Sequence, residues 1–134
     1  MKRIHNALAL AGLLAAASAS AQINFDDVEV KATALTERIH MLKGAGGNVA
    51  LLLGEEGVFM VDDQYKEMSP KLRAAIDKIT DKPLRYLINT HWHFDHTGGN
   101  EAFGAMGSLI IAHDNVRVRM AKGARMEAFN LDVP

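Results

Sequence analysis

One short stretch near the middle of the chain restricts the possible fold more than any other feature. The sequence INTHWHFDHTGGN (88–100) places three histidines and an aspartate within six positions, namely His91, His93, Asp95 and His96. Placing several ionisable side chains close together costs free energy unless a common partner accepts their lone pairs. Apolar residues precede the cluster and two glycines follow it, a pattern typical of a buried strand that turns into a helix. The fold must therefore present these side chains together at the end of a strand.

The spacing of these residues indicates a metal site. Residues two apart at a strand end project to the same side, so His91 and His93 can point at one ion. Asp95 and His96 follow where the chain turns, and they face a neighbouring point. Imidazole and carboxylate suit zinc well, and iron, nickel or manganese with less selectivity. The alternative, unrelated histidines on a polar turn, is less favoured because such turns do not call for clustered imidazoles.

The rest of the chain predicts an α/β (α+β) fold, in which a mixed sheet is covered by helices on one face. The motif falls at the carboxyl end of a strand, the edge at which open α/β sheets build their sites. We expect an amphipathic helix over 69–80, with Ser69 as its N-cap and Pro70 at its first position. The other expected elements are strands over 28–33, 38–42, 48–53, 58–61, 84–89 and 108–113, a turn at 54–57, a short helix over 98–104, and a helix over 114–124 capped by Asp114.

The first 21 residues have the layout of a secretory signal peptide. Lys2 and Arg3 form a basic start, an Ala/Leu-rich run covers 7–17, and Ala19-Ser20-Ala21 offers a cleavage site. The apolar run is shorter than the ~20 residues that a bilayer-spanning helix needs. A membrane anchor and an ordinary Ala-rich helix remain alternatives. The layout favours a periplasmic or secreted protein.

Composition narrows the partners of the mature chain, residues 22–134. The formal charge is −1 and becomes about −3 without Lys2 and Arg3, and no basic run suggests a nucleic-acid partner. After signal cleavage nothing suggests a membrane partner, and the oligomeric state is not determined. No cysteine is present, so stability must come from a core or a metal, and thiolate is not a possible ligand. The final EAFNLDVP offers no closing strand or helix, so we expect a fragment, the front part of a larger domain.

THWHFDHTGGN resembles the signature of the metallo-β-lactamase superfamily of metallo-hydrolases. KGAGGNVALLLGEEGVFMVDDQY resembles the strand–loop–strand before that signature, and GSLIIAHDNVRVRM resembles the segment after it. The resemblance implies an αββα sandwich built from two similar halves, with metals at one edge between the sheets. This chain would supply the first half.

The resemblance also implies roles for the residues. His91 and His93 would bind a first Zn²⁺, and Asp95 and His96 a second, with Asp95 also orienting the nucleophile. Asp62 matches an aspartate that hydrogen-bonds and orients the metal loop. The Asp-His pair is like that of glyoxalase II, lactonases and the β-lactamase subclass with an extra histidine.

The chain departs from the family after the motif. The family's third histidine, its bridging aspartate and its last histidine are not found after residue 96, so the site is expected to be incomplete. His113, the only later histidine, is best explained as a polar residue at a strand–helix junction.

These observations favour an exported zinc-dependent metallo-hydrolase acting on a small molecule. A metal-bound hydroxide would attack the carbonyl of a β-lactam, lactone or thioester. Two alternatives stay open: a non-catalytic periplasmic metal-binding accessory protein, and a di-iron redox member of the same superfamily. Trp92 and Phe94 alternate with the histidines and are expected to point into packing. Gly46 and Gly47 fit a loop over the substrate as well as a plain hairpin turn.

Overall fold

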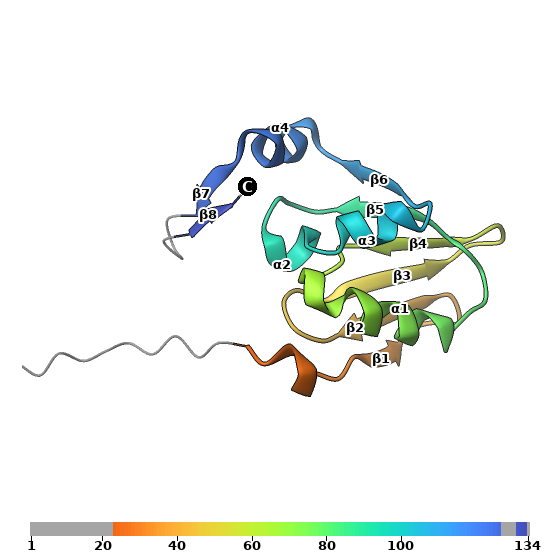
Figure 1. Cartoon of the computed structure of the whole chain (residues 1–134). Coiled ribbons are helices and arrows are strands. Elements are labelled where there is room, and N and C mark those ends of the chain that lie inside the picture. The colour runs from red at the N-terminus through yellow and green to blue at the C-terminus, as the bar shows by residue number, and fades with distance from the viewer. Residues whose placement is uncertain (1–22, 127–130, 134) are drawn as a thin grey trace, which may run out of the picture.

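The computed structural model describes residues 23–126 and 131–133, and a six-stranded sheet forms its centre. The predicted signal peptide lies outside the described residues. The strands follow the chain in order across the sheet (Figure 1). They are β1 (Lys31–Ala34), β2 (Ile39–Lys43), β3 (Val49–Leu53), β4 (Val58–Val61), β5 (Leu84–Asn89) and β6 (Leu109–Ala112).

The sheet is mixed, as predicted. Strands β1 to β4 pair antiparallel, whereas β4–β5 and β5–β6 pair parallel because a helix-containing crossover joins them. Gly54 and Gly57 close the β3–β4 hairpin, where the Gly54 amide donates to the Gly57 carbonyl at 2.9 Å. The first strand begins at Lys31, three residues later than expected, because η1 (Phe25–Asp27) and an irregular stretch precede it.

The helices are η2 (Lys66–Met68), α1 (Ser69–Asp77), α2 (Phe94–Thr97), α3 (Asn100–Ala105) and α4 (Asp114–Lys122). Helix α1 confirms the amphipathic helix, but Ser69 as its N-cap was wrong. The cap position is Met68, because η2 runs directly into α1. Asp114 as the cap of α4 was also wrong. His113 takes that position, and its Nδ1 accepts from the Asn115 amide at 3.1 Å.

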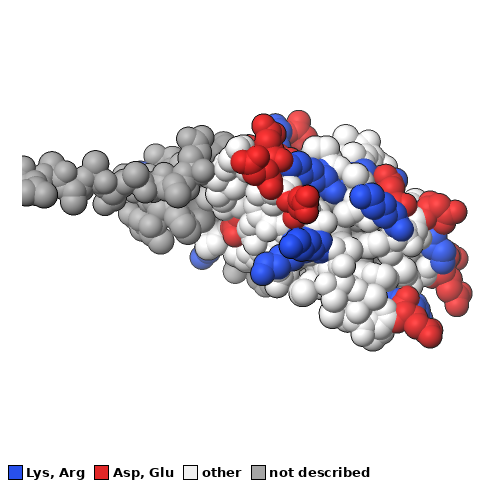
Figure 2. Space-filling model, turned by 90° about the horizontal axis from the view of Figure 1, so that it is seen from below, with Lys and Arg blue, Asp and Glu red and all other residues white. Residues whose placement is uncertain are grey.

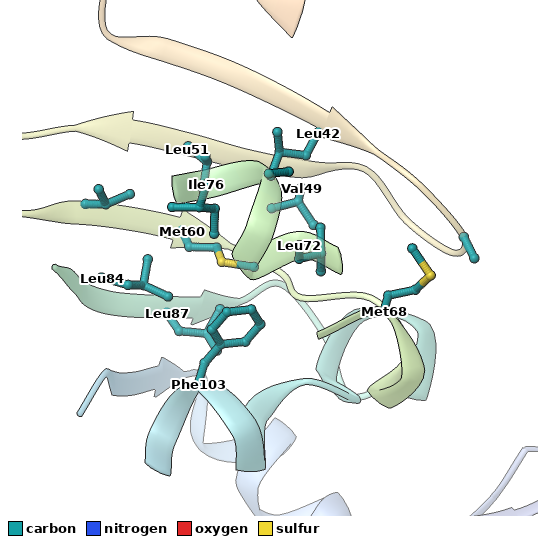
Figure 3. Packing of buried hydrophobic residues seen from close by; sticks show 13 residues of the cluster. Leu42, Val49, Leu51, Met60, Met68, Leu72, Ile76, Leu84, Leu87 and Phe103 are labelled. Atoms are coloured by element: carbon teal, nitrogen blue, oxygen red, sulfur yellow. The ribbon is translucent and has the colours of Figure 1, made fainter. Parts of the chain in front are cut away.

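The core lies between the sheet and helices α1 and α3 (Figure 3). Leu72 and Ile76 of α1 pack in one cluster with Leu51 and Met60 of the central strands, and Phe103 of α3 packs next to Leu87. All of these side chains are almost completely buried. Apolar burial of this kind contributes about 1.5–3 kcal/mol for each large side chain, and it fixes the strand ends from which the motif emerges.

The opposite face of the sheet is apolar and accessible in the described structure. Leu52 alternates with the buried Leu51 and is 40% exposed, because successive side chains point to opposite faces of a sheet. Leu109 and Ile111 of β6 are 60% and 42% exposed. We call Ile39, Leu52, Leu109 and Ile111 the open face.

The last described residues form a small second sheet. Strands β7 (Ala124–Met126) and β8 (Leu131–Val133) pair antiparallel, so the expectation that no strand closes the chain was wrong. Helix α4 and this hairpin extend from the β6 edge of the main body (Figure 1). None of the helices in the described ranges is long and apolar enough to cross a membrane.

Candidate metal site

The motif forms a loop that is tied down at both ends. Residues 90–99, called the metal loop here, follow β5 and include α2. At its start, the Thr90 amide donates to Asp62 Oδ1 at 2.8 Å. At its end, the Gly99 amide donates to Asp63 Oδ1 at 2.9 Å. Asn100 Nδ2 then donates to Asn89 Oδ1 at 2.9 Å, which joins the residues on either side of the loop.

The segment after β4 forms the other wall of the site. Asp62 and Gln64 have φ angles of 59° and 60°, a left-handed backbone that is uncommon outside glycine. Both side chains are buried. This turn lets the Asp63 amide donate to the His96 carbonyl at 3.0 Å, while the Gly98 amide donates to the Gln64 carbonyl at 2.9 Å. Two backbone hydrogen bonds therefore join this segment to the metal loop at His96 and Gly98.

The structure brings the three motif histidines together. The ring centroid of His91 lies 4.7 Å from that of His93 and 4.0 Å from that of His96, and all three residues are half-buried. His96 Nε2 lies 3.5 Å from Asp95 Oδ2. Tetrahedral zinc with bonds of about 2.0–2.2 Å separates its ligand atoms by about 3.4 Å, so this pair fits one edge of such a site.

Asp62 is the centre of the hydrogen bonding around the cluster. Its Oδ2 accepts from Thr90 Oγ1 at 2.7 Å and lies 2.8 Å from His96 Nδ1, and Oδ1 accepts the Thr90 amide. The side chain is 5% exposed, so protein groups replace the water that would hydrate a carboxylate. With these three contacts the carboxylate orients the loop and the His96 ring.

Asp62, His91 and His96 also form a group whose potential ligand atoms lie within 4.8 Å of one another, the one such group of three among the described residues. His93 and Asp95 lie outside this group, although each contacts one of its histidines. Since the oxygens of Asp62 already accept hydrogen bonds, we assign Asp62 an orienting contact rather than a place in the ligand set. The donor set is nitrogen and oxygen and fits zinc.

The glycine loop before β3 packs on the site. A Cβ atom at Gly47 would overlap the His96 ring, and one at Gly46 would lie 2.8 Å from the Asp95 carbonyl oxygen. Gln64 Nε2 donates to the Gly47 carbonyl at 2.6 Å and holds the loop there. The loop is therefore more than a plain hairpin turn, because its lack of side chains lets it touch the motif.

The local environment shifts three pKa values. Burial, followed by the neighbouring His96 and His93, lowers the pKa of His91, which favours the neutral imidazole that a metal requires. Burial raises the pKa of Asp63 to about 7, against the lowering effect of the Gly99 amide. Burial and the charges of Asp95 and Glu67 raise the pKa of Tyr65.

Trp92 and Phe94 contact the surroundings of the loop rather than the main core. The Trp92 ring meets the His93 ring at 5.0 Å, and the guanidinium of Arg119 lies 5.7 Å from the Trp92 ring centroid. Phe94 packs at 5.4 Å against Tyr65. Both side chains are half-buried, so the expected packing role holds only in part.

Sequence reasoning missed several residues that build the site. Thr90, Asp63 and Gln64 all contact the metal loop or its glycine neighbour, and none of them was singled out. The available signal was position alone, since Thr90 precedes the first histidine and the other two follow Asp62.

Comparison with known proteins agrees with this geometry. The sequence profile of the metallo-β-lactamase superfamily matches residues 42–126, a range that spans both loops of the site. The chain belongs to the metallo-β-lactamase superfamily. A stretch of 49 residues is also 41% identical to a linear primary-alkylsulfatase from Pseudomonas sp. (strain ATCC 19151), and it covers 36% of this chain and 9% of that protein.

Solved structures of the superfamily share the fold. A metallo-β-lactamase with a HARLDQ motif from Cronobacter sakazakii superposes with a TM-score of 0.68 at 23% identity, covering 79% of this chain and 43% of that one. The subclass B3 enzyme BJP-1 of Bradyrhizobium japonicum gives 0.66 at 20% identity, covering 79% and 42%. This chain therefore spans less than half the length of these superfamily structures. The described sheet with its helices corresponds to part of their α/β sandwich.

Charges of both signs share one face of the molecule. Lysines, arginines and acidic residues are interspersed on the face shown in Figure 2, without a patch of one sign. The matched proteins are named as an alkylsulfatase and as metallo-β-lactamases.

Proposed function

We propose that the protein is an exported zinc-dependent metallo-hydrolase. His91 and His93 would hold one Zn²⁺, and Asp95 and His96 a second. The observation that carries the proposal is the convergence of three imidazoles and one carboxylate next to a buried aspartate, Asp62, that holds His96 and Thr90. Superfamily membership supports the same reading.

The protein groups hold the reacting parts in place. A bound zinc pair lowers the pKa of a water molecule to near neutrality and polarises the bond to be cleaved. Asp62 and Thr90 keep the loop in a fixed position, so the ligands need little reorganisation. The carboxylate of Asp95 has a second oxygen, Oδ1, in addition to the Oδ2 atom that lies next to His96. This second oxygen would orient the attacking water molecule. Gly46 and Gly47 bring the loop backbone into direct contact with Asp95 and the His96 ring, which limits the movement of both residues.

The proposed substrates are small molecules with a β-lactam, lactone or thioester carbonyl. The local match to an alkylsulfatase adds a sulfate ester as a fourth class to be tested. Export is supported by the order of basic, apolar and small residues in 1–21, and mass spectrometry of the secreted protein checks it. A mature chain that begins at Gln22 is the expected result.

Hydrolysis by the purified full gene product tests the proposal. We expect turnover of at least one of the four substrate classes, loss of turnover with a chelator, and recovery with Zn²⁺. Asp95→Asn and His96→Gln should each lower kcat at least about 100-fold. His113→Gln, outside the cluster, is the matched control. Activity that survives thorough metal removal contradicts a metallo-hydrolase.

Metal analysis separates the alternatives. Two zinc ions per molecule agree with the proposal, whereas iron in a redox-active pair points to the di-iron alternative. Tight zinc binding with no turnover of any substrate class points to an accessory protein instead.

A further inference from the structure

We propose that Thr90 is a positioning residue that fixes the tautomer of His91, so that the Nε2 atom of this histidine is the one free to bind a metal. The inference rests on the proposed metal site and deepens it. A neutral histidine carries its proton on only one ring nitrogen, and the nitrogen without the proton is the metal ligand.

Hydrogen-bond accounting around the Thr90 hydroxyl leads to this assignment. The hydroxyl has one hydrogen, and it donates that hydrogen to Asp62 Oδ2 at 2.7 Å, because an ionised carboxylate can only accept. His91 Nδ1 lies 3.0 Å from the same hydroxyl oxygen. Since the hydroxyl hydrogen is already used, the Nδ1 atom must be the donor in this contact. His91 is thereby held as the Nδ1–H tautomer.

The same aspartate sets the tautomer of His96 without an intermediate. His96 Nδ1 lies 2.8 Å from Asp62 Oδ2 and donates to it, which leaves Nε2 facing Asp95 at 3.5 Å. One carboxylate therefore orients two imidazoles, one by direct contact and the other through Thr90. The hydrogen bonds from Asp62 through the Thr90 hydroxyl to His91 are called the relay here. The Thr90 amide bonds to Asp62 Oδ1 whatever the side chain at position 90 is, so a substitution can remove the relay and keep the backbone contact that holds the loop.

Nitrogen NMR of the metal-free full-length protein tests the relay directly. With ¹⁵N-labelled histidine at about pH 8.5, some two units above the ordinary histidine pKa, the imidazoles are neutral and their tautomers can be assigned. We expect Nδ1–H for His91 in the wild type and in Thr90→Ser. Thr90→Val removes the acceptor with little change of shape, so His91 should lose this preference. Thr80→Val is the control, because its hydroxyl serves a turn between α1 and β5.

Zinc affinity gives the second measurement. Thr90→Val should bind zinc about 10-fold more weakly, whereas Thr90→Ser should stay close to the wild type and Thr80→Val should be unchanged. An Nε2–H tautomer of His91 in the metal-free wild type overturns the inference. So does an unchanged tautomer in Thr90→Val. The NMR measurement needs neither metal nor substrate, so absence of hydrolysis with the expected tautomers would reject the proposed function alone.

Discussion

Glycine residues decide how closely the backbone approaches the candidate ligands. Gly47 touches the His96 ring so closely that any Cβ atom would displace it, and Gln64 prevents the loop from moving away. The tight contact limits the movement of the imidazole, and Asp62 holds its Nδ1 atom. A substitution at Gly47 therefore acts on the metal site even though glycine has no chemistry of its own.

We expect Gly47→Ala to weaken zinc binding at least about 10-fold, because the His96 ring must shift. Isothermal titration of the metal-free protein with zinc measures the effect. Gly104→Ala is the control, since a Cβ atom there meets only the end of Ile110 at 3.4 Å. Equal affinities of the two variants would contradict a positioning contact at Gly47.

Asp63 makes stability depend on pH. Its pKa rises from 3.8 to about 7 in the folded chain because the carboxyl group is buried. Between these values the folded state binds more protons than the unfolded state, so the free energy of unfolding falls as the pH rises through this window. We expect Asp63→Asn, which cannot ionise, to reduce that slope in metal-free protein. Urea denaturation from about pH 4 to 8 measures it, and parallel pH profiles of the two proteins would reject the assignment.

The residues that sequence reasoning found and missed differ in a simple way. His91, His93 and Asp95 are visible because their residue types are rarely clustered without a metal. Thr90 and Gln64 are common residue types, and their roles depend on contacts with segments 17 to 28 positions away along the chain. No local pattern encodes such contacts.

Among the elements, α1 is fastened to the N-terminal segment by one lysine. Lys71 Nζ donates to the carbonyl oxygens of Phe25, Asp26 and Val28 at 2.7 to 2.8 Å. A protonated amine has three hydrogens, so all of them are used. The segment before β1 is thereby held against the helix layer.

We expect Lys71→Met to lower the free energy of unfolding by about 1–3 kcal/mol, because three carbonyl groups lose a charged donor. Urea denaturation gives this value, and limited proteolysis shows whether residues 23–30 become accessible. Lys78→Met, an exposed substitution on the residue that follows α1, is the control. Equal stability of both variants would mean that the three hydrogen bonds contribute nothing.

Helix α4 is held more lightly than α1. Val116 is its only buried residue, and Arg119 lies over the Trp92 ring of the metal loop. An exposed contact between a cation and an aromatic ring contributes about 0.5–1 kcal/mol. The helix should therefore exchange its amide hydrogens sooner than α1.

Arg119→Gln should raise the amide exchange rate of α4 about 2- to 5-fold, in proportion to the lost contact. Hydrogen–deuterium exchange with mass spectrometry measures it. Arg117→Gln removes the same charge from the same helix and should have a smaller effect. Identical exchange in the two variants would show that the Trp92 contact does not hold α4.

Helices and strands were predicted correctly where a regular pattern of apolar residues continues over several positions. The prediction failed for the shortest helices and strands. Helix α1 and the five strands β2 to β6 all overlap their predicted ranges. Helix α2 covers only four residues and is part of the site itself, since it contains Asp95 and His96 and His93 occupies its N-cap position. Strands β7 and β8 have three residues each, too few to show an alternating pattern.

At the scale of the whole molecule, the described residues form a helix layer on one face of the six-stranded sheet and leave the other, apolar face accessible. The family resemblance implies an αββα sandwich in which two sheets pack on each other, and facing sheets bury their apolar faces. The open face has the residues for such packing, since Leu52, Leu109 and Ile111 present large aliphatic side chains.

We expect Leu52→Glu to lower the free energy of unfolding of the full-length protein by at least about 2 kcal/mol, because a carboxylate would enter an apolar contact. Leu35→Glu is the control, as Leu35 lies in a turn and is 58% exposed. Thermal or urea denaturation compares them. If the two variants lose the same stability, the open face is solvated in the protein.

Trp92 is the only tryptophan of the chain, and it stands between two of the clustered histidines. Light that excites tryptophan but not tyrosine therefore excites Trp92 alone. The emission of this indole reports on the neighbouring imidazoles without any attached dye. Intrinsic fluorescence in a stopped-flow instrument can therefore follow the kinetics of metal binding.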